Sequence, residues 1–172
     1  MTRILGIDPG SNITGYGIID CEGNHSTHVS DGTVHAGGND LPEKLRTIFE
    51  QITGLICKYQ PDEIAVEQVF MHRNADSALK LGQARGAAIT ACTLQSLPVY
   101  EYTPNQIKQA TTGRGHATKQ QVQHMIKVLL CLDRIPVTDA ADALAVALCH
   151  AHSRQGLQRM GKVKGIRGGR LQ

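Results

Sequence analysis

The sequence predicts an α/β domain built on a mixed five-stranded sheet with helices on both faces. Three segments with β-type patterns come first, at 3–8, 13–20 and 25–35, and their short connections indicate an antiparallel meander. After residue 40, amphipathic helical segments alternate with short apolar strands. Such alternation favours strands that are covered by helices, so the two patterns together predict a mixed sheet.

β-forming residues and glycines define the three N-terminal strands. The first strand is an apolar run that ends at Asp8, where Pro9 and Gly10 stop it sharply. The second contains Gly15 and Gly17, small residues which indicate that something approaches its backbone closely. The third is more polar, and we expect it toward an edge of the sheet.

Side-chain caps mark where later helices begin. Asp40, Thr103 and Thr118 each precede a helical segment, and a glutamate or glutamine follows three positions later. Gly82 and Gly86 lie on one face of the helix expected at 74–95, which predicts close packing against another helix or the sheet. We expect the later strands at 63–67 and 97–101, short helices after 103 and 118, and longer helices at 41–56 and 139–149.

Length and composition are those of one globular domain. The chain has 172 residues, of which 41% are hydrophobic, enough for a good core. No apolar run approaches membrane-spanning length, and the N-terminus reads as a strand rather than a signal segment, so we expect a cytoplasmic protein without membrane contact. The five cysteines are widely spaced and form no C-x-x-C pattern, which indicates free thiols rather than disulfides or a zinc site.

Positive charge is concentrated at the C-terminal end. The net charge is +3, yet residues 154–172 contain six basic residues and no acid, while the remainder carries twelve basic and fifteen acidic residues. A basic tail on a slightly acidic body is typical of proteins that contact nucleic acid, although such a tail can also serve solubility alone. We expect a folded domain over 1–153 and a disordered basic tail over 154–172.

Four acidic residues stand at the ends of apolar elements. Asp8 and Glu67 end the first and fourth strands, and Asp139 and Asp142 open the last helix and share one of its faces. If the first and fourth strands are neighbours, the four carboxylates converge at one edge of the sheet. Each also has a structural alternative: Asp8 can cap a turn, Glu67 can be solvated, and the helix acids can interact with the helix dipole, worth about 0.3–1 kcal/mol each.

Convergence of these carboxylates favours a divalent cation. Two unit charges about 4 Å apart repel by about 4 kcal/mol at an effective dielectric near 20, against a total stability of only about 5–15 kcal/mol. Ligands that are all carboxylates suit Mg²⁺ or Mn²⁺ rather than zinc. A pair of such ions about 3.5–4 Å apart can support attack of water on a phosphodiester. The pattern therefore predicts a two-ion Mg²⁺ site in which Mn²⁺ can substitute.

One aromatic and several basic residues indicate a nucleic-acid substrate. Phe70, one of two phenylalanines, follows Glu67 in a loop, where a ring can insert between bases or stack on them; alternatively, it fastens the loop to the core. Basic residues in loops or near helix starts can contact phosphates, although each can equally be a solvated charge. These basic residues are Arg73, Lys80, Lys108, Arg114 and Lys119.

Three long motifs resemble those of the bacterial RuvC Holliday-junction resolvases. The likeness covers residues 3–152 and leaves the tail outside, and motifs of this length are highly specific. The matching segments are ILGIDPGS at 4–11 with TGYG at 14–17, VEQVF at 66–70 with NADSALKLGQARG at 74–86, and DAADALA at 139–145.

This resemblance implies an RNase H-like fold and a homodimer that makes paired, Mg²⁺-dependent nicks across a four-way DNA junction in homologous recombination and DNA repair. It implies cooperation with the RuvA and RuvB branch-migration proteins and a preference for thymine-containing sites. The family's catalytic acids fall on Asp8, Glu67, Asp139 and Asp142, its base-contacting aromatic on Phe70, and its DNA-contacting lysines on Lys108 and Lys119. We expect Asp8 to bridge the two ions, and the products to carry 5′-phosphate and 3′-hydroxyl ends.

Three other functions compete with this interpretation. Asp8-Pro9-Gly10-Ser11 followed by Thr14-Gly15 also resembles the first phosphate loop of actin-like nucleotide-binding enzymes, but 172 residues leave no room for their second lobe. A non-catalytic junction-binding module would suit the basic tail, but it has no need of four converging acids. A nuclease that does not recognise DNA structure is the third alternative.

Overall fold

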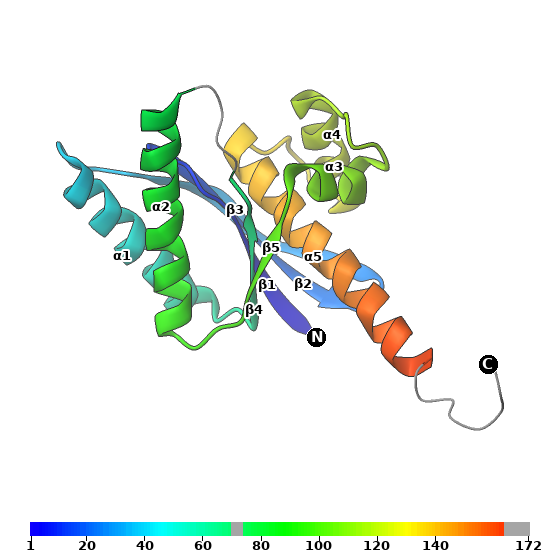
Figure 1. Ribbon diagram of the computed structural model, residues 1–172. Helices are drawn as coiled ribbons and strands as arrows, with labels where there is room; N and C mark the ends of the chain where they lie inside the picture. Colours follow the sequence, from blue (N-terminus) through cyan, green and yellow to red (C-terminus); the bar gives the residue numbers. More distant parts are fainter. Residues whose placement is uncertain (70–73, 164–172) are drawn as a thin grey trace, which may run out of the picture.

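A mixed five-stranded sheet forms the centre of the molecule (Figure 1). The computed structural model describes residues 1–69 and 74–163. The strand order is β3-β2-β1-β4-β5, with β1, β2 and β3 antiparallel and β4 and β5 parallel to β1, so the predicted mixed sheet and the edge position of the third strand are confirmed. The strands are β1 (Thr2–Asp8), β2 (Ile13–Glu22), β3 (His25–His35), β4 (Glu63–Glu67) and β5 (Val99–Tyr102).

Helices cover both faces of this sheet, as predicted. Figure 1 shows α1 and α2 on one side and α3, α4 and α5 on the other. Thr103 and Thr118 form complete capping boxes, and the Asp40 side chain accepts a hydrogen bond from the Glu43 backbone, so the predicted helix starts are confirmed. The helices are α1 (Leu41–Tyr59), α2 (Ala75–Leu94), α3 (Pro104–Thr112), α4 (Lys119–Leu129) and α5 (Thr138–Val163).

The sheet separates two hydrophobic cores. Between the sheet and the first two helices, side chains such as Leu5, Ile48 and Ile64 are fully buried. On the opposite face, Ile4 and Leu144 are equally buried among α3, α4 and α5. Because full burial of one such side chain is worth about 1.5–3 kcal/mol, β1, which contributes to both cores, is the most constrained strand.

Glycines in β1 and β2 let α5 lie directly on the sheet backbone. Gly6 and Gly17 are partners in the register of the two strands. A Cβ at Gly17 would lie 2.7 Å from the backbone nitrogen of Leu144, and one at Gly6 would collide with the carbonyl of Ala143. Gly15 meets the backbone of Asp139 in the same way. The close approach predicted at Gly15 and Gly17 is therefore confirmed, and the element that approaches is α5.

Two sequence predictions differ from the structure. Gly82 and Gly86 lie on the exposed side of α2, where an added Cβ would meet no atom of the chain within 4 Å, so the predicted close packing within the chain is wrong. The boundary expected at 153 falls inside α5, which continues to Val163. Arg154 belongs to the folded body, since its Nε donates a hydrogen bond of 2.9 Å to Glu63.

Cysteine chemistry and membrane topology agree with the composition. All five cysteines are free thiols. Within the part of the chain that the structure describes, no helix is both long enough and apolar enough to cross a membrane.

The contact between Gly6 and α5 predicts an asymmetry between two glycine-to-alanine substitutions. Gly6→Ala should lower the free energy of unfolding by about 1–3 kcal/mol, because backbone atoms of α5 must move to admit the methyl group. Gly54→Ala, at an open position of α1, should be neutral or stabilising by up to about 1 kcal/mol. Urea unfolding measures both, and a Gly6→Ala protein as stable as Gly54→Ala would contradict this account.

Candidate active site

Asp8 lies at the end of β1, where a pinned turn carries the chain away from the sheet. Thr14 is fully buried, and its hydroxyl both accepts a hydrogen bond from the Gly10 nitrogen (3.2 Å) and donates one to the Gly10 carbonyl (3.1 Å). A Cβ at Gly10 would collide with the carbonyl of Ile13, so this glycine is required by the turn itself. The turn therefore fixes the direction in which Asp8 leaves the sheet.

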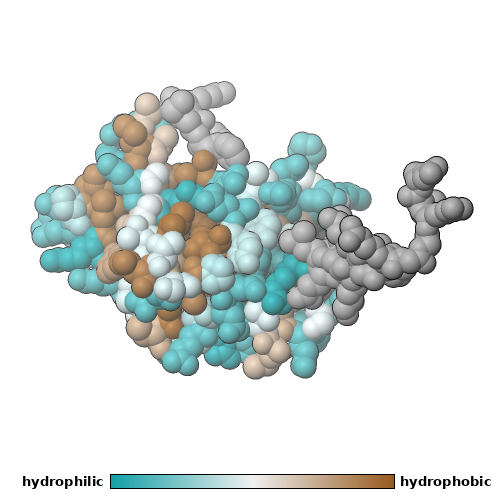
Figure 2. All heavy atoms as spheres, turned by 60° about the horizontal axis from the view of Figure 1, so that its bottom comes forward, coloured by the Kyte–Doolittle hydropathy of each residue, from teal (hydrophilic) through white to brown (hydrophobic). Residues whose placement is uncertain are grey.

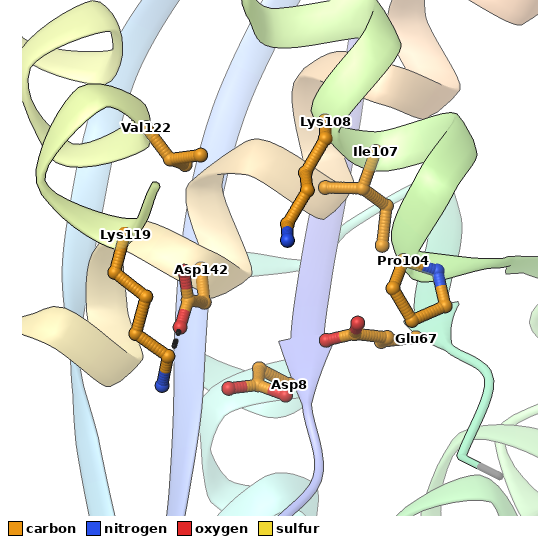
Figure 3. A pocket seen from close by; sticks show the side chains of 8 residues that line it. All are labelled: Asp8, Glu67, Pro104, Ile107, Lys108, Lys119, Val122 and Asp142. Atoms are coloured by element: carbon orange, nitrogen blue, oxygen red, sulfur yellow. Dashed lines mark ion pairs between the residues drawn. The ribbon is translucent and has the colours of Figure 1, made fainter. Parts of the chain in front are cut away.

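Glu67 reaches the same edge from the neighbouring strand. β1 and β4 are parallel, and their register ends with Ile7 opposite Val66. The next residues along these strands are Asp8 and Glu67, so their carboxyl groups leave the sheet side by side. Figure 3 shows the two side chains facing each other across the floor of a cavity.

The first turns of α5 bring a third carboxylate to this edge. Asp142 is half-buried, and it lies on the turn that precedes the contact of Leu144 with Gly17. Asp139 stands one turn earlier and does not line the cavity, yet its charge helps to raise the pKa of both Asp8 and Asp142. The predicted convergence is thus confirmed for three acids, with Asp139 at the margin.

A cavity of about 250 Å³ lies between these acids and two lysines. In Figure 3 the ammonium groups of Lys108 and Lys119 point into it from α3 and α4. Lys119 Nζ is 4.0 Å from Asp142 Oδ2, which is an ion pair at its longest range. The residues that line the cavity are Asp8, Glu67, Pro104, Ile107, Lys108, Lys119, Val122 and Asp142. It therefore combines anionic and cationic groups above an apolar wall.

Burial and mutual repulsion make Asp8 a very weak acid. Burial contributes most, and the charges of Glu67, Asp142 and Asp139 add to it, so that the pKa of Asp8 rises from 3.8 to about 9. A hydrogen bond between the carboxyl groups of Asp8 and Glu67 acts in the same direction on Asp8. Without a cation, Asp8 therefore carries a proton at neutral pH, and the two side chains share it.

The two other carboxyl groups are perturbed in the same sense. Burial raises the pKa of Glu67, and the hydrogen bond from Asp8 and the nearby charges of Lys119 and Lys108 oppose it. Burial also raises the pKa of Asp142, again against the lysines. The lysines thus offset part of the negative charge, and the raised pKa values show that much of it remains uncompensated.

This donor set fits divalent ions that prefer carboxylate oxygen. Uncompensated, buried carboxylates are the ligands that hard cations such as Mg²⁺ use. Among the described residues, no three Asp, Glu, His or Cys side chains are close enough together to hold one ion. The carboxylates therefore surround the cavity instead of meeting at one point, and ligation requires their side chains to turn inward.

The remaining predicted DNA contacts fall in different places. Arg114 lines a separate hollow of about 600 Å³ between α3 and α4, next to His124, and does not reach the acids. Lys80 lies on α2, where its Nζ is 2.7 Å from Asp76. Phe70 and Arg73 lie outside the described residues.

Two residues that support the site were not singled out in the sequence. Thr14 pins the turn after Asp8, and a threonine next to glycines carries no pattern that distinguishes this role. Arg85 donates a hydrogen bond of 3.2 Å from its Nε to the backbone carbonyl of Glu67. Its signal was a charged residue, only partly exposed, in a helix otherwise rich in alanine and leucine.

Comparisons with known proteins agree on one family. The model of the crossover junction endodeoxyribonuclease RuvC matches residues 4–150. The chain is 57% identical over 157 residues to the crossover junction endodeoxyribonuclease RuvC of Shewanella oneidensis, a match that covers 91% of each chain. It is 55% identical to the RuvC of Shewanella sediminis, over 94% of this chain and 93% of that one.

Solved structures place the fold in the same group. Thermus thermophilus RuvC, solved in complex with a Holliday junction substrate, matches with a TM-score of 0.84 and 34% identity, over 91% of this chain and 97% of that one. The yeast mitochondrial Holliday junction resolvase has a TM-score of 0.67 at 14% identity, over 95% of this chain and 84% of that one, and shares the fold. The RNase H-like architecture expected from the sequence is thereby confirmed.

The raised pKa of Asp8 predicts how the metal-free protein responds to pH. A carboxyl group with a higher pKa in the folded than in the unfolded state stabilises the fold at low pH and loses this contribution as pH rises from about 4 to about 9. Asp8→Asn removes the loss. In EDTA, the stability of Asp8→Asn relative to the unmodified protein should therefore grow with pH, by at most about 1.4 kcal/mol per pH unit.

Denaturant unfolding at a series of pH values measures this difference. The comparison isolates Asp8, because the lowered pKa of His150 acts with the opposite sign but equally in both proteins. Addition of Mg²⁺ should favour the unmodified protein instead. A stability difference that stays constant from pH 5 to pH 9 would contradict the proton assignment.

Proposed function

The chain belongs to the RuvC family of metal-dependent, Holliday-junction-resolving endonucleases, and on that premise we propose that Asp8, Glu67, Asp139 and Asp142 hold two Mg²⁺ ions that cut the DNA backbone. The observation that carries the proposal is the ring of three buried carboxylates around one cavity, of which Asp8 has its pKa raised to about 9. Only a cation or a proton relieves such repulsion. Mn²⁺, which accepts the same ligands, should substitute.

Each carboxylate has a place in this arrangement. Asp8 stands between Glu67 of β4 and Asp142 of α5, so it is the side chain suited to share both ions. Asp139, one turn before Asp142, would complete the ligation from the margin of the cavity. When bound, the ions activate the attacking water and stabilise the departing 3′ oxygen, which yields 5′-phosphate ends.

The two lysines prepare the cavity for a phosphodiester. Their ammonium groups point at the space between the acids and carry the positive charge that an incoming phosphate requires (Figure 3). At 4.0 Å the pair of Lys119 with Asp142 is weak, so Lys119 can exchange the carboxylate for a phosphate oxygen. Pro104, Ile107 and Val122 form an apolar wall that limits the access of bulk water.

The wider context follows the family. We propose that Phe70, Arg73 and Arg114 contact DNA around the cavity, that the enzyme acts in the cytoplasm in recombination and repair, and that RuvA and RuvB deliver the junction. The basic residues beyond α5 would add salt-dependent, non-specific affinity for DNA.

A second copy of the chain has a suitable docking surface on α2. Leu79 and Leu94 are 68% and 66% exposed, and Gly82 and Gly86 leave open space between them along the exposed side of this helix. On the face shown in Figure 2, apolar residues gather over the side formed by α1 and α2, whereas most of the remaining surface is hydrophilic. We propose that the homodimer forms through this side of α2, where glycines let two helices approach closely.

Substitution of Asp8 tests the catalytic assignment. Asp8→Asn should slow cleavage of a synthetic four-way junction by at least about 10²-fold, the scale on which loss of one electrostatic group slows catalysis. Binding of the junction in EDTA should stay intact or tighten, because repulsion between the phosphate and the carboxylates falls. Gel-based binding and cleavage assays measure both, with linear duplex as the structure control.

Asp133→Asn is the matched control, since Asp133 is exposed and lies outside the cavity. It should bind and cut like the unmodified protein. Junction binding by the unmodified protein without nicking in Mg²⁺ would favour a non-catalytic module, and equal cutting of duplex and junction would favour a nuclease that does not recognise structure.

The dimer surface predicts a position-dependent effect of arginine. Gly86→Arg should shift the protein toward the monomer, because a long charged side chain on the exposed side of α2 keeps a second helix away. Gly54→Arg places the same side chain at an equally open glycine of α1 and should leave the dimer intact. Light scattering coupled to size-exclusion chromatography measures the mass. If Gly86→Arg remains a dimer, the interface lies elsewhere.

A further inference from the structure

Glu67 is held at a point where the sheet itself can no longer hold it. In a parallel pair, alternate residues of a strand direct both backbone groups to the same neighbour. Ile64 and Gln68 donate to the carbonyls of Pro98 and Tyr102 on the β5 side, so the backbone of Glu67 faces β1. The register of β1 with β4, however, ends at Val66.

Pro9 explains why the ladder stops there. If the pairing continued, the carbonyl of Glu67 would accept a hydrogen bond from the backbone nitrogen of residue 9. That residue is a proline and has no N–H to donate. A carbonyl without a donor at a half-buried strand end is costly, and the strand that carries the Glu67 carboxylate would be loosely fixed.

Arg85 supplies the missing donor from the other face of the sheet. Its Nε donates to the Glu67 carbonyl at 3.2 Å, and its Nη2 lies 2.6 Å from Glu101 Oε2 on β5. The second contact is an ion pair, because the buried Nη2 makes no hydrogen bond of adequate geometry. The side chain is mostly buried beside Ala84 and Ala88, which are packed in the core under α2. Arg85 therefore ties the ends of β4 and β5 to a helix in the core.

From these contacts we infer that Arg85 is a positioning residue for the metal-binding carboxylate of Glu67. It does not line the cavity and acts through the backbone of its neighbour. Its fork replaces the strand pairing that Pro9 ends, so that Glu67 stays opposite Asp8. This is a different role from that of Lys108 and Lys119, whose charges point into the cavity.

Arg85→Met tests the inference, because it keeps the aliphatic stem and removes every donor. Mn²⁺ binding to the full-length protein without DNA, followed by electron paramagnetic resonance, should weaken by about 10-fold or more, the usual effect of losing a group that orients a ligand. The Mg²⁺ concentration for half-maximal cleavage should rise by a similar factor. Junction binding in EDTA should not change.

Three further variants separate positioning from general stabilisation. Glu101→Gln removes the ion pair but leaves the hydrogen bond to Glu67, and Arg46→Met removes an exposed arginine that pairs with Glu50 on α1. Both should bind Mn²⁺ as the unmodified protein does. Arg85→Lys keeps the charge but lacks the fork, and it should give an intermediate affinity. If Arg85→Met fails to fold, the lysine variant decides.

Two outcomes would overturn the inference. One is an unchanged response to Mn²⁺ and Mg²⁺ in Arg85→Met, or in Arg85→Lys if only that protein folds. The other is an equal loss in Glu101→Gln, which would assign the effect to the ion pair. The inference rests on the metal-assisted cleavage proposed above. Cleavage by the unmodified protein in Mg²⁺ and in EDTA tests that premise separately, so the two failures are distinguishable.

Discussion

The contact of α5 with the bare backbone of β1 and β2 is the constraint on which the site depends. Gly6 and Gly17 face each other in the register and leave a strip without side chains, and the helix backbone fills it at Ala143 and Leu144. An ordinary side chain at either glycine would lift the helix by the width of a methyl group. Because Asp142 precedes this contact directly, its distance from Asp8 is set by the packing of the backbone.

The same packing creates an electrostatic cost that the fold retains. Three half-buried carboxylates share one cavity, and the pKa of Asp8 rises to about 9 as a result. Lys108 and Lys119 lower the pKa of Glu67 and Asp142 only in part. A site that is strained by like charge without its cation is suited to bind divalent ions strongly, and the lysines that moderate the charge also prepare the cavity for a phosphate. Stability and catalysis therefore compete for the same side chains.

Much of this architecture was predictable from local patterns. Capping residues such as Thr103 and Thr118 marked helix starts, because their hydrogen bonds involve residues within one turn. The two strand-end acids and the acidic first turn of the last helix were also visible. Other features were not. The openness of Gly82 and Gly86, the distance of Arg114 from the acids and the continuation of α5 to Val163 depend on which surfaces meet. A single sequence does not record that.

The sequence by itself determined which groups could do chemistry: carboxylates at the ends of Asp8 and Glu67 strands, and two more at the start of a buried helix. It left open whether they meet, because that required the first and fourth strands to be neighbours. Only the tertiary structure decided this, by pairing Ile7 with Val66. It also showed why Asp8-Pro9-Gly10 ends as it does. The proline that stops β1 removes a donor that Glu67 needs, and Arg85, far along the chain, supplies it.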